Sequence, residues 1–284
     1  MSFRNVNWKL GSVMNINKQF IMPWLGEDAF EWSFRRPALA SLFKWILCRR
    51  PPVRPPAETF TVLKPKIGET AMGAEENIRV TWIGHASCAV EMSGLLILTD
   101  PIFSNSCAPT QWTGPRRIVA AACSIADLGR VDLVLISHNH YDHLDYDSVM
   151  EIESRYHPVF VGGIGLAKWF IDTAGIAPDR VIEMDWWEEK TLFNDRLSLQ
   201  FLPTQHWSKR HIWGDERESL WGAFAVKNQF AKFFFNGDTG YNVELYEEIG
   251  RRIGPVDIAA IPIGAYEPRK IMQAQHINPE EAAM

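Results

Sequence analysis

The feature that most constrains the fold is a continuous apolar segment, Val131–Ser137, that leads directly into the hexapeptide HNHYDH at residues 138–143. The segment reads VDLVLIS, which has the length and composition of a strand buried on both faces. Three imidazoles and one carboxylate so close together are difficult to explain as packing, because purely structural turns favour Gly, Asn and Ser. Imidazole suits zinc, and carboxylate neutralises part of a cation's charge. The pattern therefore predicts a metal site at the end of a buried strand.

Two further candidate ligands follow expected strands. His206 comes after Leu197–Leu202, and Asp238 comes after Lys232–Asn236 in a GDTG turn whose glycines permit a sharp backbone path. Each signal is weak alone, because a lone histidine or such a turn is structural about as often as functional. Combined with the hexapeptide at one sheet edge, the two residues predict a single site.

Short strands alternate with helices from residue 78 onward, which predicts a layered α/β fold. Strands are expected at 78–83, 89–92, 95–98, 131–137, 159–161, 180–184, 197–202, 221–226, 232–236 and 257–263. Helices are expected at 145–156, 166–173 and 243–252, and Ser93-Gly94 is expected to form a hairpin turn.

Residues 1–77 have a different character and are interpreted as an N-terminal extension. An apolar helical face recurs at Leu39, Leu42, Phe43, Ile46 and Leu47, and a proline-rich linker follows at 51–56. The helix either docks on the main domain or contacts a membrane surface, since its aromatic residues and basic end suit an interface.

Composition excludes several classes of function. The formal net charge is -5, so no basic footprint for nucleic acid is present. The four cysteines form no C-x-x-C pair and no secretory signal opens the chain, which favours free thiols and an intracellular protein that is not secreted. No apolar run approaches the roughly 20 residues that cross a bilayer, so any membrane contact is expected to be peripheral.

Several segments together resemble a known family. SHNHYDHLD carries the H-x-H-x-D-H signature of the metallo-β-lactamase superfamily. RVTWIGHAS, LTDPIFS, DWWEE, QHWSKR, FFFNGDTGY, DIAAIPIGAYEPR and QHINPEEA resemble the family of N-acylphosphatidylethanolamine-hydrolysing phospholipases D, from about Arg79 to the end. The resemblance implies an αββα sandwich of two mixed sheets flanked by helices, formed by a hydrolase domain at residues 78–284.

The resemblance also implies a role for individual residues. His138, His140 and His206 would bind one zinc ion, Asp142 and His143 a second, and Asp238 would bridge both. Asp100 would orient a ligand histidine, Tyr141 and His276 would contact substrate, and Lys209 and Arg210 match a region where bile acids bind. His85 follows a strand and is expected either to support a ligand or to be purely structural.

One departure from the family concerns the second zinc ion. A further histidine ligand lies downstream in the family, in a segment resembling IHWGTF, and no such segment occurs up to Met284. We therefore expect the last elements of the fold to be missing and the second zinc site to lack one ligand. The resemblance makes His276 a substrate-side group and not that ligand.

The implied activity is a zinc-dependent phosphodiesterase that converts N-acylphosphatidylethanolamine to N-acylethanolamine and phosphatidic acid. Its catalytic groups would be Asp142, Asp238 and His276, and a homodimer at the cytosolic face of membranes is expected. Two alternatives stay open. The chain is either another hydrolase of the superfamily, such as a lactonase, thioesterase or nuclease, or an inactive form that binds lipid.

Overall fold

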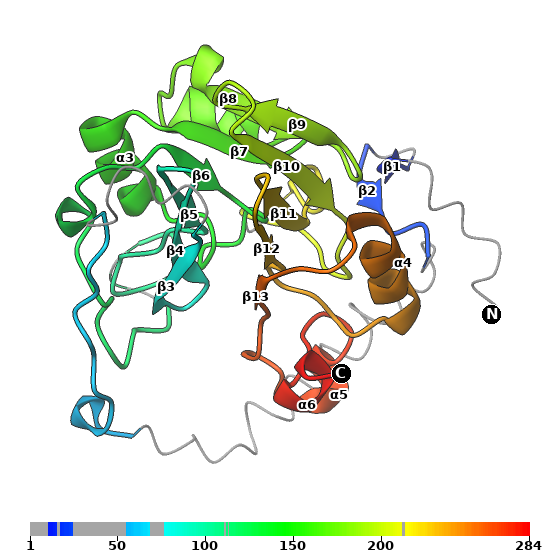
Figure 1. The fold of residues 1–284 in the computed structure, drawn as a ribbon. Helices are drawn as coiled ribbons and strands as arrows, with labels where there is room; N and C mark the ends of the chain where they lie inside the picture. Colours follow the sequence, from blue (N-terminus) through cyan, green and yellow to red (C-terminus); the bar gives the residue numbers. More distant parts are fainter. Residues whose placement is uncertain are drawn as a thin grey trace.

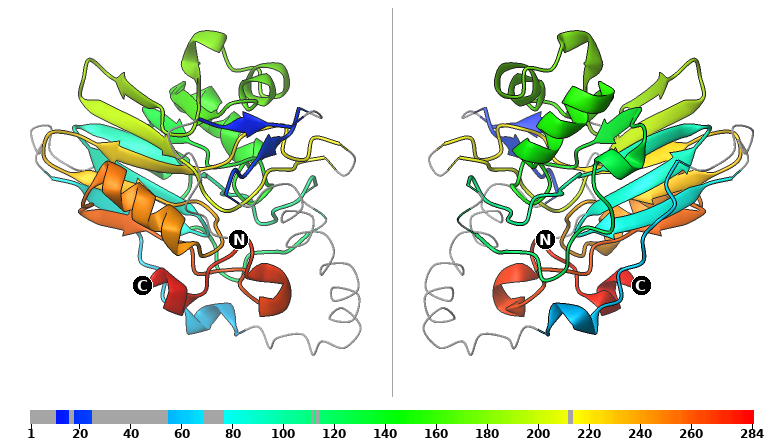
Figure 2. Two further views of the ribbon diagram at one scale, coloured as in Figure 1. Left: turned by 90° about the vertical axis from the view of Figure 1, so that its right-hand side faces the viewer. Right: turned by 90° about the vertical axis from the view of Figure 1, so that its left-hand side faces the viewer.

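The computed structural model describes residues 11–15, 18–24, 55–68, 77–110, 112, 114–211 and 214–284. Two β-sheets lie face to face, and α3 and α4 lie on opposite sides of the pair (Figures 1 and 2). This arrangement is the α/β sandwich of two mixed sheets predicted from the sequence, and that fold class is confirmed.

The first sheet contains six strands in sequence order: β3 (Arg79–Gly84), β4 (Ser87–Met92), β5 (Leu95–Thr99), β6 (Leu133–Leu135), β7 (Val159–Gly163) and β8 (Val181–Met184). The strands from β3 to β5 pair antiparallel, and those from β5 to β8 pair parallel. The predicted Ser93-Gly94 turn joins β4 to β5, and both of its residues have positive φ (53° and 67°), as a tight two-residue hairpin requires.

The second sheet contains five strands: β9 (Glu189–Leu192), β10 (Leu197–Leu202), β11 (Ala223–Lys227), β12 (Lys232–Phe235) and β13 (Ile258–Ala260). Its order is β13-β12-β11-β10-β9, antiparallel except for the parallel pair β12–β13. Because β10 and β12 both run antiparallel to β11, their carboxyl ends reach the same edge of the sheet.

Alternation along the first sheet divides its side chains between two cores. On one face, Ile97, Leu133 and Leu135 join the larger cluster, which also contains strand residues of the second sheet. On the other face, Leu98 and Val134 pack in a second cluster with residues of α3. Because the buried strands are apolar on both faces, they read as continuous apolar runs in the sequence.

The two long helices form where they were predicted and are capped by polar side chains. In α3 (Tyr146–Tyr156) the Asp145 carboxylate accepts a hydrogen bond from the Ser148 amide, and in α4 (Val243–Ile253) the Asn242 side chain accepts one from the Leu245 amide. The predicted helix at 166–173 is instead a π-helical segment, η5 (Trp169–Thr173).

Several short elements had no counterpart in the sequence prediction. They are β9 and these further elements: β1 (Val13–Met14), β2 (Phe20–Ile21), η3 (Ala57–Thr59), η4 (Ala126–Leu128), η6 (Pro178–Arg180), α5 (Arg269–Met272) and α6 (Pro279–Ala282). In α6 the Asn278 side chain and Glu281 form a reciprocal capping box.

The described parts of the N-terminal 77 residues pack on the main domain. Phe20, Met22 and Trp24 are buried in the larger cluster, and Ile67 is buried in the second. The predicted amphipathic helix at 39–47 lies outside the described residues, as does Cys48. Within the described part of the chain, the other three cysteines form no disulfide, and no helix is both long and apolar enough to cross a membrane.

Candidate metal centre

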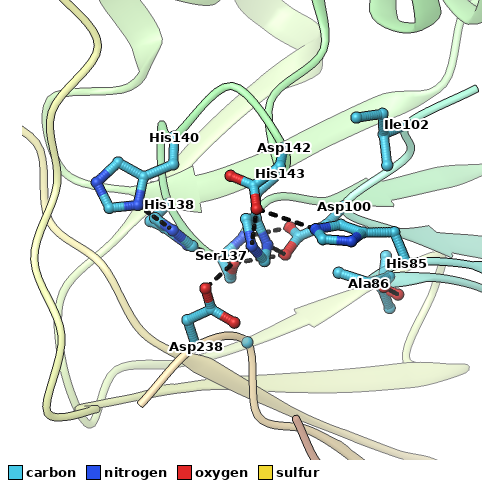
Figure 3. Close-up of polar contacts among 12 residues, drawn as sticks. His85, Ala86, Asp100, Ile102, Ser137, His138, His140, Asp142, His143 and Asp238 are labelled. Atoms are coloured by element: carbon cyan, nitrogen blue, oxygen red, sulfur yellow. Dashed lines mark hydrogen bonds and ion pairs between the residues drawn. The ribbon is translucent and has the colours of Figure 1, made fainter. Parts of the chain in front are cut away.

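The candidate ligands meet at one edge of the sandwich because each follows the carboxyl end of a strand. Asp100 directly follows β5, and the 138–143 loop begins three residues after β6. His206 and Asp238 follow β10 and β12 in the second sheet. Parallel neighbours present their carboxyl ends together, and open α/β folds commonly place ligand sites there. The structure thus brings together the residues that the sequence analysis assigned to one site. Figure 3 shows five of them, His138, His140, Asp142, His143 and Asp238.

Three imidazoles form the first half of the centre. His138 Nε2 lies 2.8 Å from His140 Nδ1, which in turn lies 3.3 Å from His206 Nε2. His138 and His206 are each only 1% exposed. We name His138, His140 and His206 the tri-histidine half.

The second half contains carboxylates as well as imidazoles. His143 Nε2 lies 3.5 Å from Asp142 Oδ2 and 3.2 Å from Asp238 Oδ2. On the other side of Asp142, His85 Nε2 lies 3.0 Å from the same Oδ2 atom (Figure 3). We name His85, Asp142, His143 and Asp238 the carboxylate half.

Asp238, a member of the carboxylate half, also faces the tri-histidine half. Its Oδ2 atom lies 3.2 Å from His143 Nε2 and 3.9 Å from His206 Nε2. One carboxylate oxygen therefore faces an imidazole nitrogen of each half, as a bridging ligand would. The same atom lies 3.7 Å from Nδ1 of His276, whose ring meets that of His206 edge to face.

Hydrogen bonds fix the orientation of three imidazoles. His143 Nδ1 lies 2.7 Å from Asp100 Oδ2, and His138 Nδ1 lies 2.9 Å from Ser137 Oγ. His206 Nδ1 lies 3.1 Å from the Gln275 carbonyl oxygen. When these Nδ1–H groups donate, the lone pair of each Nε2 faces the centre.

Of the three hydrogen-bond partners of these imidazoles, only Asp100 was expected from the sequence analysis. It was expected to orient a ligand histidine, and it contacts His143. Ser137 carried no signal beyond its place before His138. Gln275 acts through its backbone carbonyl, which any residue could supply.

Electrostatics separates the two halves. Burial lowers the pKa of His138 and His206 well below the usual value and that of His140 to about 4, so these imidazoles are neutral at pH 7. For His143, burial opposes protonation, but Asp238 and Asp142 outweigh it and raise the pKa well above its usual value. Carboxylates that attract a proton to His143 also attract a metal cation.

The donor set fits divalent metal ions. The tri-histidine half offers neutral imidazole nitrogens at short mutual distances, as zinc ligands require. His143 Nε2 is buried and has no hydrogen-bond partner of acceptable geometry, although two carboxylate oxygens lie nearby. Such an orphaned atom is costly unless something pairs with it, and a cation would do so.

Arg210 and Lys209, which the family resemblance assigned to one bile-acid region, lie in different environments. Arg210 is 9% exposed and Nη1 donates to the carbonyl oxygens of Asn139 and Leu144, at 3.2 and 2.6 Å. Its guanidinium also stacks 4.4 Å from the ring centre of Tyr141. Lys209 instead pairs with Glu216 at 3.8 Å. Arg210 therefore hydrogen-bonds to both ends of the 138–143 loop, which we name the metal loop.

Comparisons with known proteins agree with this geometry. The model of the beta-lactamase superfamily domain matches residues 96–284. A solved metallo hydrolase from Ignicoccus hospitalis has the same fold, with a TM-score of 0.50 and 24% identity over 69% of this chain and 75% of that one. The chain belongs to the metallo-β-lactamase superfamily.

Two relatives of similar sequence belong to one family within this superfamily. The N-acyl-phosphatidylethanolamine-hydrolyzing phospholipase D 1 of Caenorhabditis elegans is 35% identical over 87% of this chain and 72% of its own length. The mitochondrial N-acyl-phosphatidylethanolamine-hydrolyzing phospholipase D of Saccharomyces cerevisiae is 33% identical over 76% of this chain and 46% of its own length. The chain thus spans less than half of the yeast protein. The resemblance predicted from the sequence is confirmed.

Proposed function

We propose that the protein is a zinc-dependent phosphodiesterase that hydrolyses N-acylphosphatidylethanolamine to N-acylethanolamine and phosphatidic acid. The observation that carries this proposal is the convergence of the two histidine-containing halves on Asp238, in a chain 35% identical to a phospholipase D that acts on this lipid. His138, His140 and His206 would hold one zinc ion, Asp142 and His143 a second, and Asp238 would contact both.

The chemistry follows from the side chains that surround the centre. Two bound zinc ions would lower the pKa of a water molecule and neutralise charge that develops on phosphoryl oxygens. Asp238 can accept the proton of the attacking water. His276 Nδ1 lies 3.7 Å from Asp238 Oδ2, and in this proposal the imidazole would donate a hydrogen bond or a proton to the leaving oxygen. Tyr141 and His276 would contact the lipid.

A membrane surface is the proposed place of action. The side chain of Trp82 is 69% exposed, and its Nε1 donates a hydrogen bond to the carbonyl oxygen of His85, 2.8 Å away. An exposed tryptophan beside the centre suits the interfacial region of a bilayer.

The resemblance also leads us to propose a homodimer at the cytosolic face of a membrane. Light scattering tests the dimer, and fractionation of cells tests the location.

The test uses zinc-loaded full chain and vesicles that contain N-acylphosphatidylethanolamine. Mass spectrometry should detect N-acylethanolamine and phosphatidic acid in equal amounts, and the Asp142→Asn variant should release neither. Asp195→Asn is the matched control, because Asp195 is exposed in the β9–β10 turn and its positive φ (64°) suits asparagine. Vesicle binding without cleavage would favour the inactive lipid-binding alternative. Cleavage of only carboxylic esters or thioesters would favour another hydrolase.

A further inference from the structure

His85 occupies an unusual backbone position beside the centre. It lies in the turn between β3 and β4 with a φ of 50°, a left-handed conformation that is uncommon for residues other than glycine. The hydrogen bond from Trp82 Nε1 to the His85 carbonyl oxygen holds this turn. Strained positions of this kind cluster at functional sites, where the surrounding structure maintains them.

The turn directs the His85 imidazole toward the Asp142 carboxylate (Figure 3). His85 Nε2 lies 3.0 Å from Asp142 Oδ2, and that oxygen lies 3.5 Å from His143 Nε2. One ligand atom from each of the three residues falls within 4.8 Å of the other two. Ligands about 2.0–2.1 Å from a tetrahedral zinc ion are separated from each other by roughly 3.3 Å. The observed spacings therefore match a coordination shell before a cation is added.

A second observation indicates that this space is meant for a ligand. The side chain of His143 is only 2% exposed, and its Nε2 atom has no hydrogen-bond partner of acceptable geometry. Its Nδ1 atom is already engaged by Asp100, so the unpartnered atom is the one that faces Asp142 and Asp238. Buried polar atoms are rarely left unpaired. The His143 ring also meets the His85 ring edge to face at 5.5 Å.

We propose that His85 is a direct ligand of the second metal ion, through Nε2, together with Asp142, His143 and Asp238. This inference rests on the metal centre of the proposed function and assigns a ligand that the resemblance did not supply. The competing role is positioning only, in which His85 donates a hydrogen bond to Asp142 and never touches the cation.

The first experiment compares two histidines in matched backbone conformations. His85 and His157 have φ values of 50° and 48°, and their side chains are 46% and 66% exposed. Asparagine tolerates this conformation, so His85→Asn and His157→Asn impose similar backbone demands. Elemental analysis and zinc titration calorimetry should find two ions in the parent and in His157→Asn. In His85→Asn the affinity for the second ion should fall by more than the roughly 100-fold that loss of an outer partner causes.

Cadmium NMR separates a ligand from a positioning residue. The full chain is labelled with 15N-histidine and loaded with 113Cd, and a nitrogen bound to the metal then shows one-bond coupling. We expect a coupled Nε2 resonance that disappears in His85→Asn and persists in His157→Asn. Absence of that coupling, unchanged zinc affinities in His85→Asn, or a parent chain that holds only one ion would each overturn the proposal.

These outcomes are independent of the lipid reaction. A parent that binds two ions through His85 but releases no N-acylethanolamine would remove the proposed activity and leave the ligand assignment standing. A parent that cleaves the lipid while His85→Asn keeps both ions would do the reverse.

Discussion

The two halves of the candidate metal centre lie side by side but offer a cation different surroundings. The tri-histidine half consists only of imidazoles, with His138 and His206 buried and His140 half-buried, and it holds them neutral because burial lowers their pKa values. The carboxylate half is open to solvent at its rim, where Asp142 is 35% exposed, and its negative charge raises the pKa of His143. The tri-histidine half would attract a cation through the lone pairs of neutral imidazoles, whereas the carboxylate half would attract it through negative charge. Two ions in adjacent positions should therefore differ in how protons compete with them.

The largest effect should come from removing an imidazole of the tri-histidine half. His206→Ala should lower lipid hydrolysis by about 10³-fold, because a lost metal ion removes several kcal/mol of charge stabilisation in the transition state. Elemental analysis should show loss of the first ion with the second retained. His211→Ala, an exposed histidine nearby, is the control. Loss of both ions from His206→Ala would show that the halves bind metal as one unit.

The next largest effect should come from lowering the pH, which should weaken metal binding by the carboxylate half more than by the tri-histidine half. Burial opposes protonation of His143, but Asp238 and Asp142 outweigh it and raise the pKa of this imidazole well above its usual value, so a metal ion must compete with a proton there. Affinity for the second ion should therefore fall as the pH is lowered, by at most about tenfold per pH unit, and is compared at pH 8 and pH 6. The pKa of His140 is about 4, so the first ion should be nearly insensitive in this range. Zinc titrations at several pH values test this, and equal slopes would contradict the comparison.

Asp100→Asn should have a smaller effect, centred on the carboxylate half. The Asp100 carboxylate accepts from His143 Nδ1 at 2.7 Å and also from the amide of Ser137. Loss of such an outer partner typically costs about 10–100-fold in metal affinity. Calorimetry should find the second ion weakened more than the first. A larger loss of affinity for the first ion would show that Asp100 supports the tri-histidine half instead.

Arg210→Lys should have the smallest effect on metal affinity, and its effect should not distinguish the two halves. The loop that Arg210 clasps carries His140 of one half and Asp142 and His143 of the other. Weakened charge-assisted hydrogen bonds and lost stacking should lower the free energy of unfolding by about 1.5–3 kcal/mol, measured by urea denaturation. Lys209→Ala, which breaks only a partly exposed ion pair, should cost less than about 1 kcal/mol.

The sequence predicted that the candidate ligands would share one edge of the sandwich because strand periodicity and strand direction are local properties. Val131–Ser137, Leu197–Leu202 and Lys232–Asn236 each read as strands, and residues that follow such strands reach a shared edge. The strand β9 (Glu189–Leu192) was missed because its first three residues are polar and all four are exposed or half-buried, so that it lacks an apolar run.

Contacts between distant segments were harder to predict. The hydrogen bond from His206 to the Gln275 carbonyl has no sequence signature, because every residue carries that acceptor. His85 was left between two roles, since its approach to Asp142 depends on how the β3–β4 turn meets the metal loop. Arg210 was placed in a ligand-binding region, and nothing in its neighbours indicated that it would be buried under that loop.

The division of the centre between two sheets has a consequence for biosynthesis. A ribosome releases the six-stranded sheet first, with His138, His140, Asp142 and His143 already present, while His206 and Asp238 are still untranslated. The nascent chain at that stage holds only part of the candidate ligand set. If the proposed metal centre forms, stable metal loading should therefore wait until the second sheet emerges and packs on the first, late in folding.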